Sequence, residues 1–231
     1  MESRNFALTA ARFGVSKEET TMTKKIADLK PGTRFTYGTH NCMVLDHLEQ
    51  GTLCMVLDSV KCKFGQNNNY AESELKEYLN EWYLDSWLND GAFITDFVEM
   101  DVDLTADDGL DDYGKCRCFL APRTCEQHRK YRKLIPNLDG LEWTVTAYST
   151  ESNKCSYVAC QVTAVGGLNG GNYVYEAGGV RPLFILNSSV PFNAPVVEHT
   201  LKPGQILSVN DIQYIVDENG ILHRVEENEH E

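Results

Sequence analysis

Long apolar runs are missing from this chain of 231 residues. No stretch of about eighteen apolar residues occurs, and residues 1–21 (MESRNFALTAARFGVSKEETT) lack the continuous apolar segment of a signal peptide. We therefore expect no membrane insertion and a cytosol-like location. In such a compartment we expect the eight cysteines to remain free thiols.

Basic charge is also scarce. The 21 lysines and arginines face 34 acidic residues, which gives a net charge of -13. A charge of this sign repels a phosphate backbone, so we expect no nucleic-acid partner. The sequence also lacks a glycine-rich phosphate loop and a Gly-x-Ser-x-Gly elbow, and its six histidines form no recognisable triad. The chain therefore carries none of these catalytic motifs.

What is present is the composition of a folded protein, with 42% apolar and 24% charged residues. We predict three parts. Residues 1–24 are a polar arm that a partner would hold, and residues 25–190 are the main domain. Residues 191–231 form a linker and a small β unit that ends in an acidic tail.

The pattern within the main domain alternates between strands and helices. Residues 33–64 read as an antiparallel meander with a hairpin near Gln50 and Gly51, because the segment CMVLD occurs on both sides of that turn. Residues 70–90 predict a helix, and a second helix opens at Pro122. Strands resume at Trp143. We predict an α+β fold. The apolar face expected of the first helix consists of Leu75, Tyr78, Leu79, Trp82 and Leu88.

Two clusters are candidate metal sites. Residues 99–112 contain seven carboxylates, but a calcium loop with Gly109 at its sixth position would need acids or amides where Leu104 and Ala106 stand. A solvated acidic loop is the favoured interpretation, and an irregular calcium site is the alternative, formed by Asp107, Asp108, Asp111 and Asp112. A weaker zinc candidate consists of Cys116, Cys118, Cys125 and His128.

The order of motifs carries a resemblance: NNNYAESELKEYLN, then FLAP before a helix, a Trp-led strand, a Gly-rich turn and the closing GGVRPLFIL. Over residues 30–187 the chain resembles an uncharacterised domain family common in bacteria and their phages. That family is similar in turn to the C-type-lectin-like fold of formylglycine-generating enzymes and of retroelement variable proteins. The resemblance implies a C-type-lectin-like domain of antiparallel sheets with two helices, and a phage virion as the location, with a cytoplasmic location as the alternative.

Five residues are expected to have structural roles. Arg181 is expected to be a buried fork donor to carbonyl groups or a carboxylate, and Gly179, two residues before it, permits close approach of the backbone. Pro182, directly after Arg181, lacks a backbone N–H for a strand ladder and is expected at the start of a strand. The five residues are Trp82, Trp143, Gly179, Arg181 and Pro182.

The resemblance also implies an enzyme alternative, in which Cys155 and Cys160 are the copper-binding pair of a formylglycine-generating oxygenase. An odd offset along an extended strand sends two side chains to opposite faces, and five residues separate the α carbons by roughly 16 Å. A disulfide needs α carbons within about 7 Å. Two ordinary strand cysteines are therefore the favoured interpretation.

We instead predict a non-catalytic binding or structural protein without a cofactor. It is expected to be a virion subunit that joins other particle proteins through its arm and binds a cell-surface protein or glycan. A bacterial ligand-binding protein of the same fold is the alternative, and homo-oligomers are compatible with either. Loops rich in tyrosine, asparagine and glycine are the expected contact segments. The candidate contact residues are Asn68, Asn69, Tyr70, Tyr113, Asn169, Asn172 and Tyr173.

Overall fold

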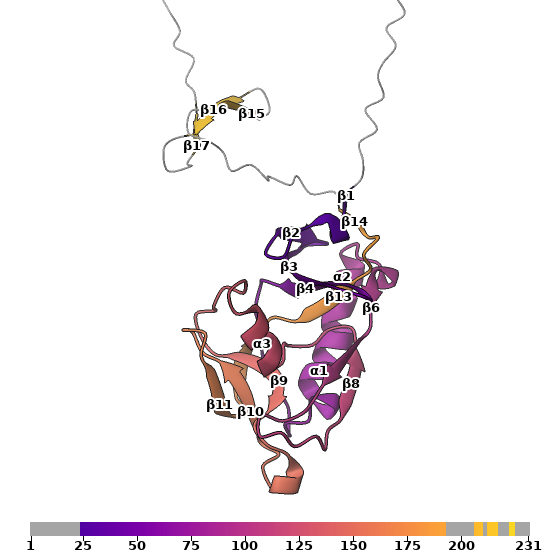
Figure 1. The fold of residues 1–231 in the computed structure, drawn as a ribbon, viewed down its shortest axis with the longest axis vertical. Coiled ribbons are helices and arrows are strands. Elements are labelled where there is room, and N and C mark those ends of the chain that lie inside the picture. The colour runs from indigo at the N-terminus through magenta and orange to yellow at the C-terminus, as the bar shows by residue number, and fades with distance from the viewer. Residues whose placement is uncertain (1–23, 193–205, 210–211, 217–221, 225–231) are drawn as a thin grey trace, which may run out of the picture. The chain divides into compact units, whose positions relative to one another are not determined.

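The computed structural model describes residues 24–192, 206–209, 212–216 and 222–224. The chain divides into one unit that ends at Asn193 and a second that begins at Ala194 (Figure 1). The expected arm, except for Lys24, and the acidic tail lie outside the described residues. Strand β1 (Lys24–Lys25) pairs with β14 (Pro191–Phe192), so the first unit continues past the expected boundary at residue 190.

Two five-stranded sheets form most of the first unit. The first has the order β2 (Arg34–Tyr37), β3 (His40–Leu48), β4 (Gly51–Val56), β13 (Leu183–Leu186) and β6 (Phe97–Val98). The second has the order β11 (Leu168–Tyr173), β10 (Val158–Val162), β9 (Glu142–Ala147), β12 (Ala177–Val180) and β5 (Val60–Lys63). Among the described pairs only β9 and β12 run parallel. A separate ribbon pairs β7 (Met100–Asp103) with β8 (Lys115–Cys118).

Two helices of more than one turn accompany these sheets, so the predicted α+β class is confirmed. The first is continuous through α1 (Glu74–Glu77), the π-helical segment η3 (Tyr78–Tyr83) and α2 (Leu84–Asn89), and the second is α3 (Cys125–Tyr131). Short 3-10 turns complete the unit: η1 (Ile26–Asp28), η2 (Tyr70–Glu72), η4 (Ile94–Asp96) and η5 (Glu151–Asn153). None of the helices in the described part of the chain is long and apolar enough to span a bilayer.

The hairpin predicted from the repeated CMVLD segment is confirmed. Strands β3 and β4 pair antiparallel, with Leu48 opposite Gly51 and Cys42 opposite Val56. Gly51 is required by close approach, because a β carbon there would lie 2.4 Å from the backbone oxygen of Leu186 on the neighbouring strand β13. The turn residue therefore also allows the sheet to continue from β4 into β13.

The predicted face of the long helix is correct in its first half and wrong in its second. Leu75 and Leu79 are buried, but Trp82 is 71% exposed, and Tyr83 and Trp87 lie in the core instead. The cause is the π-helical segment, whose i→i+5 hydrogen bonds place about one more residue in the turn than an α-helix does. Trp82 lies within that segment, where the wider turn brings Tyr83 to the core in its place.

The second helix begins three residues later than predicted. Thr124 is its N-cap and accepts a hydrogen bond from the Gln127 backbone, while the Gln127 side chain accepts from the Thr124 backbone. This reciprocal capping box fixes the start of the helix at Cys125. Pro122 therefore belongs to the loop before the helix.

The second unit contains a three-stranded antiparallel sheet, formed by β15 (Ile206–Val209), β16 (Ile212–Val216) and β17 (Leu222–Arg224). These are the strands that the turns KPGQ and DENG predict. Strand β15 follows the first turn, and β16 and β17 lie on either side of the second.

Candidate functional site

Arg181 joins a buried charge cluster in the first unit. Its Nε and Nη2 donate to the Glu142 carboxylate at 3.0 and 2.6 Å, and Nη2 also donates to the Pro136 carbonyl at 2.9 Å. Arg123 donates to the same carboxylate through Nη1 and Nη2 at 2.7 and 2.8 Å. The three side chains of this arginine–glutamate cluster are at most 2% exposed. Sequence reasoning identified Arg181 as a fork donor but missed both partners.

The surroundings of this cluster explain why glycine and proline flank Arg181. A β carbon on Gly179 would lie 2.9 Å from the hydroxyl of Ser59, and Pro182 directly precedes β13. Trp143, on the strand that also carries Glu142, is fully buried and donates to the Cys62 carbonyl. The arginine of the GGVRP segment is therefore buried, with its donors directed at protein groups.

Four of the predicted contact residues lie in an internal network. Asn68 is fully buried, and its Nδ2 lies 2.7–2.9 Å from three backbone carbonyl oxygens. Tyr113 donates to the side-chain oxygen of Asn68 at 2.7 Å. Tyr70 is fully buried and donates to the Leu120 carbonyl, and Asn69 caps the turn η2. The prediction of a binding role was wrong for the buried Asn68 and Tyr70, because their polar atoms are used within the protein.

The other three predicted contact residues lie on β11, the edge strand of the second sheet. Tyr173 is 48% exposed, and its ring stacks on the Tyr157 ring at 6.0 Å and on the Tyr175 ring at 5.2 Å between centroids. Tyr148, also 48% exposed, packs beside Gly170 of the same strand. We call these four rings, Tyr148, Tyr157, Tyr173 and Tyr175, the tyrosine surface.

The register of the second sheet explains how two of these rings come to one face. Tyr173 pairs with Val158, whose carbonyl oxygen accepts a hydrogen bond from the Tyr148 backbone. Residues directly opposite each other in neighbouring strands share a face of the sheet. Asn169 and Asn172 lie on the same edge strand, β11, and are partly exposed. Their partners are Gln161 and Ala159, and side chains alternate along a strand, so these two amides lie on the opposite face of the sheet from Tyr148 and Tyr173.

None of the eight cysteines, all of which lie in the described residues, forms a disulfide. The prediction of two strand cysteines is confirmed for Cys160 but wrong for Cys155, which lies in the turn before β10 and donates its backbone N–H to the Thr150 carbonyl. The partner that Cys160 meets is Cys125, at the first position of α3. The cysteine pair implied by the oxygenase resemblance is thus replaced by a different pair.

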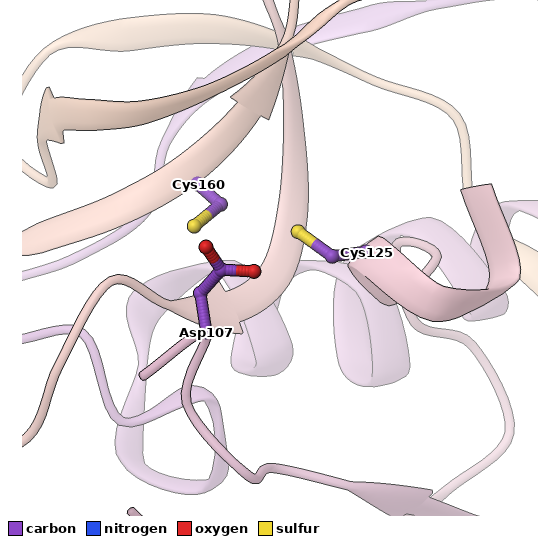
Figure 2. Close-up of side chains that lie close together, drawn as sticks. All are labelled: Asp107, Cys125 and Cys160. Carbon is purple, nitrogen blue, oxygen red and sulfur yellow. The ribbon is translucent and has the colours of Figure 1, made fainter. Parts of the chain in front are cut away.

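Asp107, Cys125 and Cys160 form a compact group of potential ligands (Figure 2). One carboxylate oxygen and the two Sγ atoms all lie within 4.8 Å of one another. The two cysteines are almost fully buried, whereas the Asp107 side chain is 35% exposed and accepts a hydrogen bond from Arg129 at 3.2 Å. We call this group the Asp–Cys–Cys cluster. It is the only set of three or more such ligands found among the described residues.

The neighbours of the Asp–Cys–Cys cluster are polar and fixed. The Thr144 hydroxyl lies 3.8 Å from the Cys125 sulfur and donates to the Cys160 carbonyl, and the Cys125 backbone donates to the Thr146 hydroxyl. A hydrogen bond from Cys160 lowers the pKa of the Cys125 thiol to about 7, and the same contact with burial raises the pKa of Cys160. A cavity of about 310 Å³ opens beside Asp107 and Cys125.

Neither metal candidate from the sequence is assembled as predicted. Cys116 and Cys118 lie on β8, and the buried His128 has its Nε2 3.0 Å from the Gly166 carbonyl oxygen, so the zinc set is divided. In the acidic loop, Asp112 accepts from Thr150 and Asp108 from the Leu110 backbone, and the four acids form no ligand group. One residue from each candidate, Cys125 and Asp107, instead belongs to the Asp–Cys–Cys cluster. Compared with protein-family models, with curated proteins and with solved structures, the chain matches none.

Proposed function

We propose that the chain is a non-catalytic binding protein whose tyrosine surface contacts a cell-surface protein or glycan. The observation that carries the proposal is the stack of Tyr157, Tyr173 and Tyr175, in which each ring is about half exposed. Tyrosine offers a large apolar area and a hydroxyl while it loses little rotamer entropy on binding, which is why binding loops are rich in it. Rings already held by stacking lose still less freedom.

The residues around the rings support the same function. Gly170 lets the Tyr148 ring pack against the edge strand, and Gly171 leaves open space there because a β carbon would meet nothing within 4 Å. Stacked aromatic rings also bind single-stranded nucleic acid, but such sites combine the rings with a positively charged groove. The net charge of -13 opposes that partner. An uncharged or basic ligand is therefore favoured.

The location of this binding function rests on the sequence resemblance. A C-type-lectin-like domain on a phage particle, joined to other particle proteins through residues 1–24, accounts for the arm and for a binding surface on one domain. A bacterial ligand-binding protein of the same fold is the alternative. Mass spectrometry of purified particles distinguishes the two, because only the first requires the chain to copurify with capsid or tail proteins. Removal of residues 1–23, which keeps the paired residue Lys24 of β1, should then abolish copurification.

Substitution within the tyrosine surface tests the binding function. The double variant Tyr157→Ala/Tyr173→Ala removes two stacked rings, and Trp82→Ala removes one exposed ring from the helix as the matched control. Binding is measured on a glycan array and on intact bacterial cells. We expect the double variant to lose at least about tenfold in affinity, which corresponds to about 1.4 kcal/mol. Equal binding by wild type and double variant, or binding to neither array nor cells, contradicts the proposal.

A further inference from the structure

The Asp–Cys–Cys cluster brings together ligands from three separate elements. Asp107 belongs to the loop between β7 and β8, Cys125 begins α3, and Cys160 lies within β10 (Figure 2). The loop is held in place by the hydrogen bond from the Asp107 backbone to the Ala147 carbonyl at 2.9 Å. The three ligand atoms are therefore positioned by backbone contacts and not by one flexible loop.

The separation of the ligand atoms fits a small tetrahedral site. Zinc–sulfur bonds of about 2.3 Å in a tetrahedron place two sulfurs about 3.8 Å apart. The three ligand atoms lie within 4.8 Å of one another, so small side-chain rotations bring them to that separation. Figure 2 shows the three side chains pointing toward one another from different sides.

The chemistry of the ligands selects the ion. Two thiolates favour zinc over magnesium and calcium, which bind oxygen ligands almost exclusively. Two thiolates and one carboxylate carry three negative charges, and a divalent ion with the Arg129 guanidinium balances them. The Thr144 hydroxyl, 3.8 Å from the Cys125 sulfur, is placed as an outer hydrogen-bond partner.

We propose that Asp107, Cys125 and Cys160 bind one Zn²⁺ ion, with a water molecule from the adjoining cavity as its fourth ligand. The cavity of about 310 Å³ is lined by Asp107 and Cys125, so solvent reaches the exposed side of the site. Zinc sites with three protein ligands keep such an open position, whereas structural sites are closed by four. This zinc site is independent of the proposed binding function, which uses a different group of residues.

Cobalt titration of the full chain tests the site. The protein is purified under reducing conditions, freed of metal with a chelator and titrated with Co²⁺, which gives a thiolate-to-metal charge-transfer absorption that Zn²⁺ then abolishes by displacement. We expect one ion per chain in the wild type and, in Cys125→Ser, weaker binding with a clearly reduced absorption, because only the Cys160 thiolate remains. Cys155→Ser is the matched control, because this thiol is outside the cluster, and it should behave as the wild type.

A second variant keeps the test valid if Cys125→Ser does not fold, which circular dichroism reveals. Asp107 is 35% exposed, and Asp107→Asn removes its charge without changing its size. This variant should keep the absorption but bind Co²⁺ more than about tenfold less tightly, since even outer-shell changes cost that much. The zinc site is overturned by absence of the absorption in the wild type, by absorption and affinity that are unchanged in folded Cys125→Ser, or by unchanged affinity in Asp107→Asn.

Discussion

Replacing Glu142 by glutamine removes the carboxylate that pairs with both buried guanidinium groups of the arginine–glutamate cluster. Four donor contacts of 2.6–3.0 Å converge on its two oxygens, two from Arg123 and two from Arg181. Glutamine keeps one acceptor oxygen and turns an amide donor toward a cation. Two buried positive charges are then left without a counter-charge.

The size of the effect follows from that arrangement. Removal of one partner from a buried ion pair costs about 3–5 kcal/mol, and here a single substitution affects two pairs. With a urea dependence of about 2 kcal/mol per molar, a loss of this size lowers the unfolding midpoint by about 1.5–2.5 M. The change should be measurable by urea unfolding, followed through the fluorescence of the buried Trp87 and Trp143.

Arg181→Met provides the comparison. This substitution leaves Glu142 paired bidentately with Arg123, and the residual pair is neutral. The variant loses the hydrogen bond to the Pro136 carbonyl and one ion pair. We therefore expect its free energy of unfolding to fall by about 1–3 kcal/mol, less than that of Glu142→Gln.

An exposed ion pair supplies the control for these two variants. Arg117 lies 3.0 Å from Glu99, but the two side chains are 70% and 42% exposed, and Arg117→Gln should cost at most about 1 kcal/mol. The reasoning is refuted if Glu142→Gln unfolds within about 1 kcal/mol of the wild type, or if Arg181→Met is the more destabilising of the two buried changes.

Three further predictions concern stability. Trp87→Ala should cost about 3–5 kcal/mol because Trp87 is fully buried, whereas Trp82→Ala should cost less than about 0.5 kcal/mol, and thermal unfolding of both variants tests the π-helical phase shift. Burial lowers the pKa of His128 in the folded protein, so the unfolded chain binds a proton at a higher pH than the folded chain does. The free energy of unfolding should therefore fall as the pH drops below about 6.5. Urea unfolding at pH 7.5 and 5.5 should show a smaller fall in the free energy of unfolding for His128→Gln than for the wild type. Gly178→Ala should cost about 1–3 kcal/mol, because the added β carbon would lie 2.8 Å from a buried indole nitrogen, while Gly171→Ala, which meets nothing within 4 Å, should be neutral in the same assay.

Local patterns predicted the elements that local forces determine. The hairpin around Gly51 follows from a turn signal between two apolar segments, and the start of the long helix follows from its apolar spacing. The prediction of the apolar face failed beyond Leu79, because periodicity assumes one number of residues per turn and the π-helical segment changes it.

The contact residues were harder to predict, because the same side chains serve inside and outside a protein. The sequence NNNY offered the same chemistry as GGNY, yet Asn68 satisfies backbone carbonyls in the interior while Tyr173 lies on an exposed edge strand. Burial of a polar group is favourable only where partners from other segments meet it. For Asn68 those partners lie 81–90 residues away in the chain.

The sequence by itself determined the α+β class, the hairpin, and the expectation that Arg181 is a buried fork donor. It did not determine what those groups meet. The Glu142 partner of Arg181 and the Cys125 partner of Cys160 lie 39 and 35 residues away along the chain. Strand and helix patterns depend on neighbours a few residues apart, whereas ion pairs and metal ligands depend on which elements pack together. Only the docking of α3 and the acidic loop against the second sheet placed two thiols and a carboxylate at one point.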